Sequence, residues 1–221
     1  MNNLNEILDA IKICDNDKLN QIITDKPSIA DIKTEQGISL LQFAAYCRNK
    51  SGIELLRNYR KELDIFEAAS IADIDAVTKL INQNPDLINS FSADGFTPLG
   101  LASFFGNTDI VKLLLSNGAN PGIAANNQFK VAPLHSACAT SNYDIAELLI
   151  KNGADVNARQ MQGVSPLHSA AHNGKADLAK LLIDCGADVN AKTDNGQTPL
   201  FMAEEKGFTE TAELIKQYGG Q

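Results

Sequence analysis

The sequence predicts an all-α solenoid of stacked helix-turn-helix units, because three features recur at a nearly constant period. A Pro-Leu pair appears at Pro98-Leu99, Pro133-Leu134, Pro166-Leu167 and Pro199-Leu200. A glycine follows three of these prolines at a constant distance: Gly118, Gly153 and Gly186. Apolar residues at helical spacing lie in between. Such a period is typical of supersecondary units that are each too small to bury an apolar face alone.

The Pro-Leu pair marks the start of the first helix in each unit. Thr97, Ser165 and Thr198 precede three of the prolines, and a hydroxyl there can accept a hydrogen bond from a free backbone N–H at the helix N-terminus. Proline suits the first helical position because its missing N–H would have no partner there. The small pair Ala170-Ala171 then allows this short helix to approach its neighbours closely.

A second helix follows in each unit. In the third clear copy its apolar stripe consists of Leu178, Leu181 and Leu182. Gly186 lies where a helix commonly ends in a left-handed residue, and the other two glycines of the series occupy the same place in their copies. We therefore expect two helices packed as a hairpin in every unit.

These residues resemble the ankyrin repeat, whose Thr-Pro-Leu-His signature is matched by Ser165-Pro166-Leu167-His168 and, with alanine in place of threonine, by Ala132-Pro133-Leu134-His135. The clear motifs cover residues 95–221. The resemblance implies helix pairs joined by short β-hairpin-like tips, with His135 and His168 hydrogen-bonded across repeats. It also implies that a partner meets the tips and the exposed side of the first helices.

The same period extends upstream, since Phe66 precedes Leu99 by one period and Leu8 precedes Leu41 by one period. We expect one domain, residues 1–221, of about seven repeats including the ends. Its predicted units are an N-terminal capping repeat at 1–33, a shortened repeat at 34–62, a divergent repeat at 63–94, clear repeats at 95–129, 130–162 and 163–195, and a C-terminal capping repeat at 196–221. Polar terminal units predict that the array stops at both ends, as a whole, monomeric protein.

Two departures from the period predict irregular loops. The interval from Pro98 to Pro133 is longer by two than the intervals that follow it, and we assign the two extra residues to 120–127, in a loop that projects beyond its neighbours. The interval from Leu41 to Phe66 is much shorter than one period, which leaves no room for a projecting finger before Phe66. We expect a break in the regular surface of the solenoid there.

The composition favours an intracellular protein without nucleic-acid or membrane partners. The formal net charge of −8 disfavours binding to phosphate backbones. No apolar run approaches the length of a membrane helix, and the N-terminus lacks a secretory signal. Four scattered cysteines on predicted helices favour reduced thiols: Cys14, Cys47, Cys138 and Cys185. We expect a cytoplasmic location, with delivery into a host cell as the alternative.

The sequence contains no complete motif for a catalytic or metal site. His168 and His172 are one helical turn apart, which can place two imidazoles on one metal, but no glutamate base lies between them and no third ligand is nearby. Ser165 and Thr97 suggest a nucleophile, yet their hydroxyls are needed at the helix caps. No glycine-rich phosphate loop is present. We therefore predict no enzyme activity, no metal and no cofactor.

Apolar residues at exposed repeat positions predict a protein-binding surface. Phe104 and Phe105 end one first helix, and His172 and Asn173 occupy the same positions in a later repeat. Further apolar residues lie at the tips: Phe96, Phe129, Val131, Met161 and Val164. Interface cores favour aromatic and methionine residues, and monomers rarely expose a large apolar area without a use. For the two adjacent phenylalanines the alternative is that they fold onto the neighbouring repeat and enlarge the core.

The resulting prediction is a non-catalytic scaffold that binds another protein through the concave face, formed by the tips and the first helices. Two alternatives stay open. One is a regulatory subunit or inhibitor of an enzyme, and the other is a pathogen effector that acts on host proteins.

Overall fold

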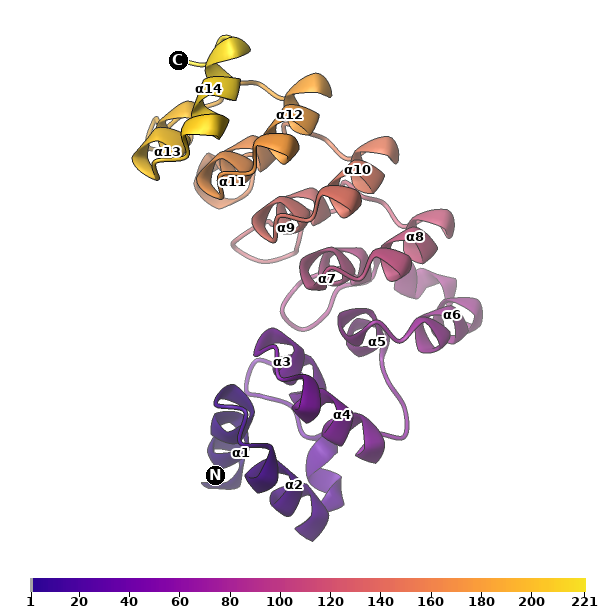
Figure 1. The fold of residues 1–221 in the computed structure, drawn as a ribbon. Helices are drawn as coiled ribbons and strands as arrows, with labels where there is room; N and C mark the ends of the chain where they lie inside the picture. Colours follow the sequence, from indigo (N-terminus) through magenta and orange to yellow (C-terminus); the bar gives the residue numbers. More distant parts are fainter. Residues whose placement is uncertain (1) are drawn as a thin grey trace.

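The computed structural model describes residues 2–221 and confirms an all-helical solenoid (Figure 1). The described residues form fourteen α-helices and no β-strand. The helices pair in chain order: α1 (Asn2–Lys12) with α2 (Asn16–Asp25), α3 (Leu40–Tyr46) with α4 (Lys50–Tyr59), α5 (Ile65–Ile71) with α6 (Ile74–Gln83), α7 (Pro98–Phe105) with α8 (Thr108–Ser116), α9 (Pro133–Ala139) with α10 (Tyr143–Lys151), α11 (Pro166–His172) with α12 (Ala176–Asp184), and α13 (Pro199–Glu205) with α14 (Thr209–Gln217). Three 3₁₀ segments supplement them: η1 (Pro27–Asp31), η2 (Pro85–Asn89) and η3 (Met161–Gly163).

The first helices begin where the Pro-Leu pairs predict. The Thr97 hydroxyl accepts a hydrogen bond from the Gly100 N–H at 3.0 Å, and the Thr198 hydroxyl accepts one from the Phe201 N–H at 3.2 Å. Ser165 forms a reciprocal capping box, in which the third helical residue is a histidine instead of the usual glutamate or glutamine. Each cap satisfies a backbone donor that the helix itself leaves free.

The turn between the two helices of each pair has the same backbone geometry throughout. One residue in each of the seven turns is left-handed, with φ between 55° and 77°: Cys14, Arg48, Ala72, Gly106, Ser141, Gly174 and Gly207. A left-handed residue lets the chain reverse within a few residues at the end of a helix. The shared turn agrees with a count of about seven units.

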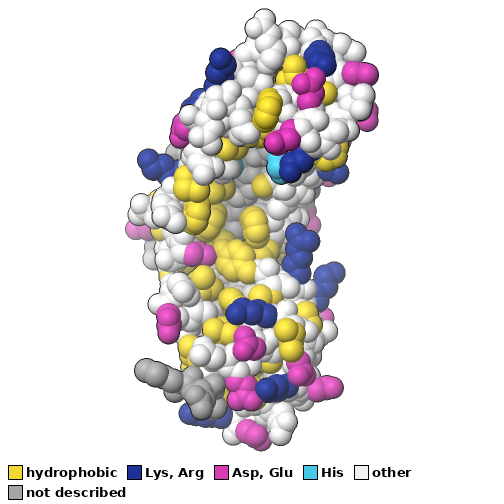
Figure 2. Space-filling model, turned by 90° about the vertical axis from the view of Figure 1, so that its left-hand side faces the viewer, with side chains coloured by type: hydrophobic (Ala, Val, Ile, Leu, Met, Phe, Trp, Pro, Cys, Tyr) yellow, Lys and Arg dark blue, Asp and Glu magenta, His cyan; other side chains and the backbone are white. Residues whose placement is uncertain are grey.

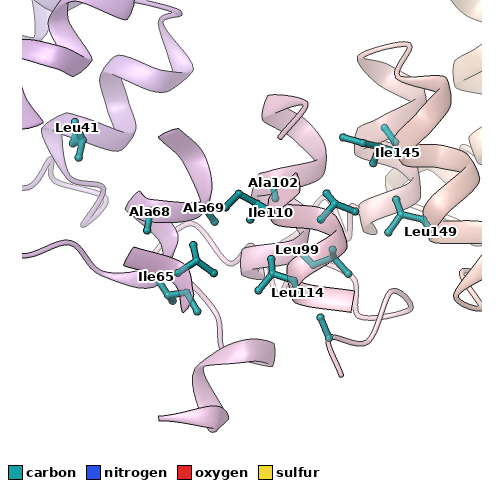
Figure 3. Packing of buried hydrophobic residues seen from close by; sticks show 14 of the residues in the cluster. Leu41, Ile65, Ala68, Ala69, Leu99, Ala102, Ile110, Leu114, Ile145 and Leu149 are labelled. Carbon is teal, nitrogen blue, oxygen red and sulfur yellow. The ribbon is translucent and has the colours of Figure 1, made fainter. Parts of the chain in front are cut away.

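The buried apolar side chains form a core that runs along the stack. Figure 3 shows it passing from Leu41 of α3 through Ala68 of α5 and Leu99 of α7 to Leu149 of α10. A smaller cluster continues it at the C-terminal end: Ala171, Leu200, Ala203, Ala212 and Ile215. Each unit therefore buries its apolar face only against its neighbours, as a solenoid requires. Within residues 2–221, no helix has the length and apolar character needed to cross a bilayer.

The tips are turns closed by backbone hydrogen bonds between residues four apart, as from Gln160 to Val164 and from Thr193 to Gln197. The tip before α9 is longer, because the Ala125 N–H donates to the Val131 carbonyl. The two extra residues therefore lie within 126–130, which overlaps the predicted stretch 120–127 only at 126 and 127. The spacing of Pro-Leu pairs could not place them within the loop, whereas the closing hydrogen bond does.

The predicted loss of one finger is confirmed. Only residues 60–64 connect α4 to α5, with no 3₁₀ segment and no tip between them (Figure 1). The tip before α3 consequently lies against the tip before α7, where a Cβ placed on Gly37 would be 2.9 Å from the Ala93 Cβ. The solenoid thus skips one finger but keeps its tips in contact.

A buried ion pair lies at this break. The Arg60 guanidinium donates to Glu67 Oε2 at 2.8 Å and to the exposed Asp31 at 3.0 Å. The Glu67 side chain is fully buried, and the same oxygen accepts a hydrogen bond from the Asp64 N–H at 2.9 Å. The pair therefore links η1, the α4–α5 connection and α5 at the point where the finger is missing.

Candidate protein-binding surface

The first helices and the tips line one hollowed side of the solenoid. Figure 2 shows this side, on which hydrophobic side chains gather in the middle and charged side chains lie mostly around them. In Figure 1 it is the side of α7, α9, α11 and α13. We call this side the concave face.

Three aromatic residues, Tyr46 from α3 and Phe104 and Phe105 from α7, form a cluster on the concave face, which we call the aromatic cluster. The ring centroids of Tyr46 lie 5.9 Å from Phe104 and 5.1 Å from Phe105, and the two phenylalanine rings meet edge to face at 5.1 Å. The edge-to-face contact between the two phenylalanines is an arrangement that aromatic quadrupoles favour. Phe104 is nevertheless 37% exposed, so the cluster presents apolar surface to solvent.

The tyrosine is fixed by a hydrogen bond to a tip. Its hydroxyl donates to Asp94 Oδ2 at 2.6 Å, across the place where the missing finger would lie. Burial, with the Asp94 carboxylate beside it, raises the pKa of Tyr46 far above its ordinary value. The phenol therefore stays a hydrogen-bond donor, and its ring is held in one orientation.

An open hollow of about 780 Å³ surrounds the aromatic cluster. Its apolar wall includes Ile53 of α4 and Ile71 of α5. Its polar lining residues are Arg48, Lys50, Glu54, Ser70, Asn107, Thr140 and Asn142. An apolar centre within a polar rim is the usual composition of a protein interface.

The predicted tip residues divide into two groups. Phe129 and Met161 are 45% and 41% exposed, and the Met161 N–H donates to the Phe129 carbonyl at 2.8 Å, which joins two consecutive tips. Phe96, Val131 and Val164 are half-buried. The tips thus carry two neighbouring exposed apolar residues on a hydrogen-bonded base.

A second, smaller hollow of about 280 Å³ lies on α11. It is lined by Val164 and His172, with Met202 of α13 at its edge. Asn173 also lines it, but its side-chain amide donates to the Ala139 carbonyl at 3.1 Å in the preceding unit. The predicted binding residues are therefore distributed over two hollows and the tips.

The two buried histidines hold adjacent units together, as the resemblance implied. His168 Nε2 lies 3.1 Å from the Gln197 carbonyl, and His135 Nε2 lies 3.2 Å from the Val164 carbonyl, in each case in the next unit. Burial lowers the pKa of both imidazoles, although their backbone hydrogen bonds oppose this shift. Both rings are therefore neutral and structural near pH 7.

The hydrogen bonds of His168 also bear on the catalytic and metal hypotheses. Its Nδ1 lies 2.8 Å from the Ser165 hydroxyl, a distance typical of a nucleophile and its base. However, both side chains are buried, and the other ring nitrogen faces a backbone carbonyl instead of an orienting carboxylate. With both nitrogens engaged, His168 has no lone pair free for a metal.

The repeated helix pairs agree with a known protein family. A model of ankyrin repeats, described as three copies, matches residues 65–160 and 159–221, which together exceed half of the chain. The chain belongs to the ankyrin-repeat family. Ankyrin repeats are protein-interaction modules and are generally non-catalytic.

Two relatives share part of this ankyrin-repeat sequence. The human DNA-binding protein RFXANK is 28% identical over 116 residues, which are 52% of this chain and 45% of that protein. The Arabidopsis thaliana serine/threonine-protein kinase VIK is 40% identical over 65 residues, which are 29% of this chain and 14% of the kinase. The chain therefore spans less than half the length of either relative.

Sequence reasoning missed Tyr46, although it occupies the same ankyrin-repeat position as Phe104. Both residues lie two positions before the left-handed residue of the turn, which is Gly106 in the later repeat and Arg48 in the earlier one. The left-handed position of the turn is a glycine only in some repeats. The arginine therefore hid the register, which the backbone angles make visible.

Proposed function

We propose that this ankyrin-repeat protein is a non-catalytic scaffold that binds another protein through its concave face. The observation that carries the proposal is the exposed aromatic cluster in an open hollow with a polar rim. Large apolar side chains that fill a central hollow supply most of the energy in many interfaces, while the polar rim excludes water. We also propose that the protein is monomeric and cytoplasmic, and free thiols at all four cysteines fit that compartment.

The larger hollow supports binding better than the smaller one. Both hollows are lined by residues of three first helices, but the larger one has about 780 Å³ against about 280 Å³ and contains the aromatic cluster. The rings of Phe104 and Phe105 pack against Tyr46, and Phe104 is still partly exposed. Further burial of such a ring on binding contributes roughly 25 cal/mol per Å² of apolar surface removed from water.

A substitution with a matched control tests the proposal. Phe104→Ser removes apolar surface from the hollow, whereas Phe91→Ser changes a phenylalanine of similar exposure, 44%, that does not line it. Partner proteins would be captured from the native cell with each variant and identified by mass spectrometry, and melting temperatures would be compared in parallel. We expect only Phe104→Ser to lose the partner, and we expect the two variants to have similar melting temperatures. Retention of the partner by Phe104→Ser would exclude this hollow as the binding surface.

A further inference from the structure

We propose that the hollow around the aromatic cluster binds an acidic peptide segment of the partner, with an aromatic or large aliphatic side chain on the cluster and a nearby carboxylate on Arg48. The inference rests on the proposed function, since it names the occupant of the same hollow. Two observations carry it: the charge of the rim, which includes Arg48 at a turn where the other units have a small residue, and a free side-chain amide in the lining.

The rim of the hollow is basic in a chain whose net charge is −8. Arg48 and Lys50 line it, with Glu54 as the one acidic residue in the lining. Further along α4, Arg57 forms an ion pair with Asp73 at 3.2 Å. Within residues 2–221, Arg48 and Lys50 form no ion pair, so both cations are available to an incoming carboxylate.

Arg48 is held in an unfavourable backbone conformation. Its φ is 55°, at the left-handed position of the inter-helix turn. The other six turns place a small residue there, either glycine, alanine, serine or cysteine. Glycine adopts this conformation without strain, whereas a residue with a Cβ does not. Cys14, Ala72 and Ser141 have the same backbone conformation in their turns, so Arg48 is distinguished by its charged side chain at the rim of the hollow.

A side-chain amide in the lining, from the unit that follows α7 and α8, completes the site. Asn142 caps α10 by accepting a hydrogen bond from the Ile145 N–H at 3.1 Å. Asn49 and Asn107 occupy the same repeat position, and their side-chain amides donate to carbonyls of a preceding unit, at 3.1 and 2.7 Å. In the described chain the Asn142 amide has no such acceptor, so it can donate to a backbone carbonyl of a bound peptide.

Three synthetic peptides test the chemistry of the occupant. They share a central Phe-Leu anchor and a fluorescein label, and they differ only in having Glu, Ser or Lys around the anchor. Their dissociation constants for the full chain would be measured by fluorescence anisotropy. We expect the Glu peptide to bind roughly tenfold more tightly than the Lys peptide, with a difference that shrinks at high salt. Equal binding of the three peptides, or binding of none, would overturn the inference.

Variants of the rim assign the preference to Arg48. Arg48→Glu should reverse the order of the Glu and Lys peptides, whereas Lys79→Glu, on the exposed part of α6 outside the hollow, should leave the order unchanged. Arg48→Gly should abolish most of the preference for the Glu peptide while it raises the melting temperature, because it removes the backbone strain. A lower melting temperature in Arg48→Gly would instead show that the arginine stabilises the fold, and would overturn its assignment to binding.

Two outcomes separate this inference from others. Aromatic rings beside cations can also stack nucleic-acid bases, so a labelled single-stranded DNA of about 12 nucleotides is measured against the same protein. Tighter binding of this DNA than of the Glu peptide would overturn the inference. If Phe104→Ser abolishes capture of the native partner and the peptides show no charge preference, the proposed function stands and only the acidic character of the occupant is wrong.

Discussion

The Ser165 hydroxyl lies 2.8 Å from Nδ1 of His168, and the Ser165 backbone N–H donates to the same nitrogen at 3.2 Å. In the preceding unit the residue at the position of Ser165 is Ala132, and Nδ1 of the buried His135 has no hydrogen-bond partner. The two units therefore have the same histidine but differ in whether its second nitrogen is satisfied. An unsatisfied buried polar atom is costly, which makes Ala132 a site for stabilisation.

Ala132→Thr should stabilise the protein by about 1 kcal/mol, because the added hydroxyl can reach Nδ1 of His135 and cap α9. The position accepts threonine elsewhere, since Thr97 is only 2% exposed. The free energy of unfolding is measured by chemical denaturation. Ala132→Val, which has the shape of threonine without the hydroxyl, is the control, and equal gains in both variants would contradict the hydrogen-bond explanation.

The stability of the protein should fall as the pH drops below about 6.5, the ordinary pKa of histidine. Burial lowers the folded-state pKa of His135 and His168, so the unfolded chain binds protons that the folded chain does not. Their contribution is complete above the unfolded pKa and is lost toward the lower folded one, by at most about 1.4 kcal/mol per pH unit for each ring.

Melting temperatures between pH 8 and pH 5 check this dependence. His168→Gln should reduce the steepness of the decline, because one buried imidazole is removed, whatever its effect on stability at pH 8. The exposed His172 provides the matched control as His172→Gln. An unchanged slope in His168→Gln would argue against a buried neutral imidazole.

Arg60→Met should destabilise the fold by about 3–5 kcal/mol, because it leaves the fully buried Glu67 carboxylate without its cation. Lys112→Met breaks the exposed pair with Asp109 and should cost less than about 1 kcal/mol. Denaturant unfolding of both variants measures the difference. Arg60→Met combined with Glu67→Leu should lose less than Arg60→Met alone, and the opposite order would show that the pair is not coupled.

Ala72→Gly should stabilise the protein by up to about 1 kcal/mol, because Ala72 has a φ of 63° and glycine adopts this region without steric cost. The same substitution at Ala139, an exposed residue with helical geometry at the end of α9, should instead destabilise it by up to about 1 kcal/mol. Shifts of opposite sign in the melting temperature would confirm that backbone conformation decides the effect. Equal signs would contradict it.

The regular parts of the fold were predictable from the sequence, because each depends on neighbouring residues. Pro98 and Thr97 specify a helix start within one turn, and Gly186 specifies a helix end in the same local way. The short interval from Leu41 to Phe66 predicted the missing finger, because chain length alone limits what can fit between two helices.

The candidate site was only partly predictable. Phe104 and Phe105 were identified from their register, but Tyr46 was not, since its turn carries Arg48 in place of glycine. The position of the two extra residues in the tip at 126–130 also escaped the sequence, because spacing counts residues without placing them.

The sequence by itself determined the repeating unit and its approximate number. Only the tertiary structure decided that the rings of α3 and α7 meet. That contact arises because one finger is absent and the intervening α5 has the small residue Ser70 at the position of Tyr46 and Phe104. Helix starts and turns follow from local backbone preferences, so the sequence predicts them. Tyr46 and Phe104 belong to repeats that are separated by a third repeat, so their contact depends on how several repeats stack together.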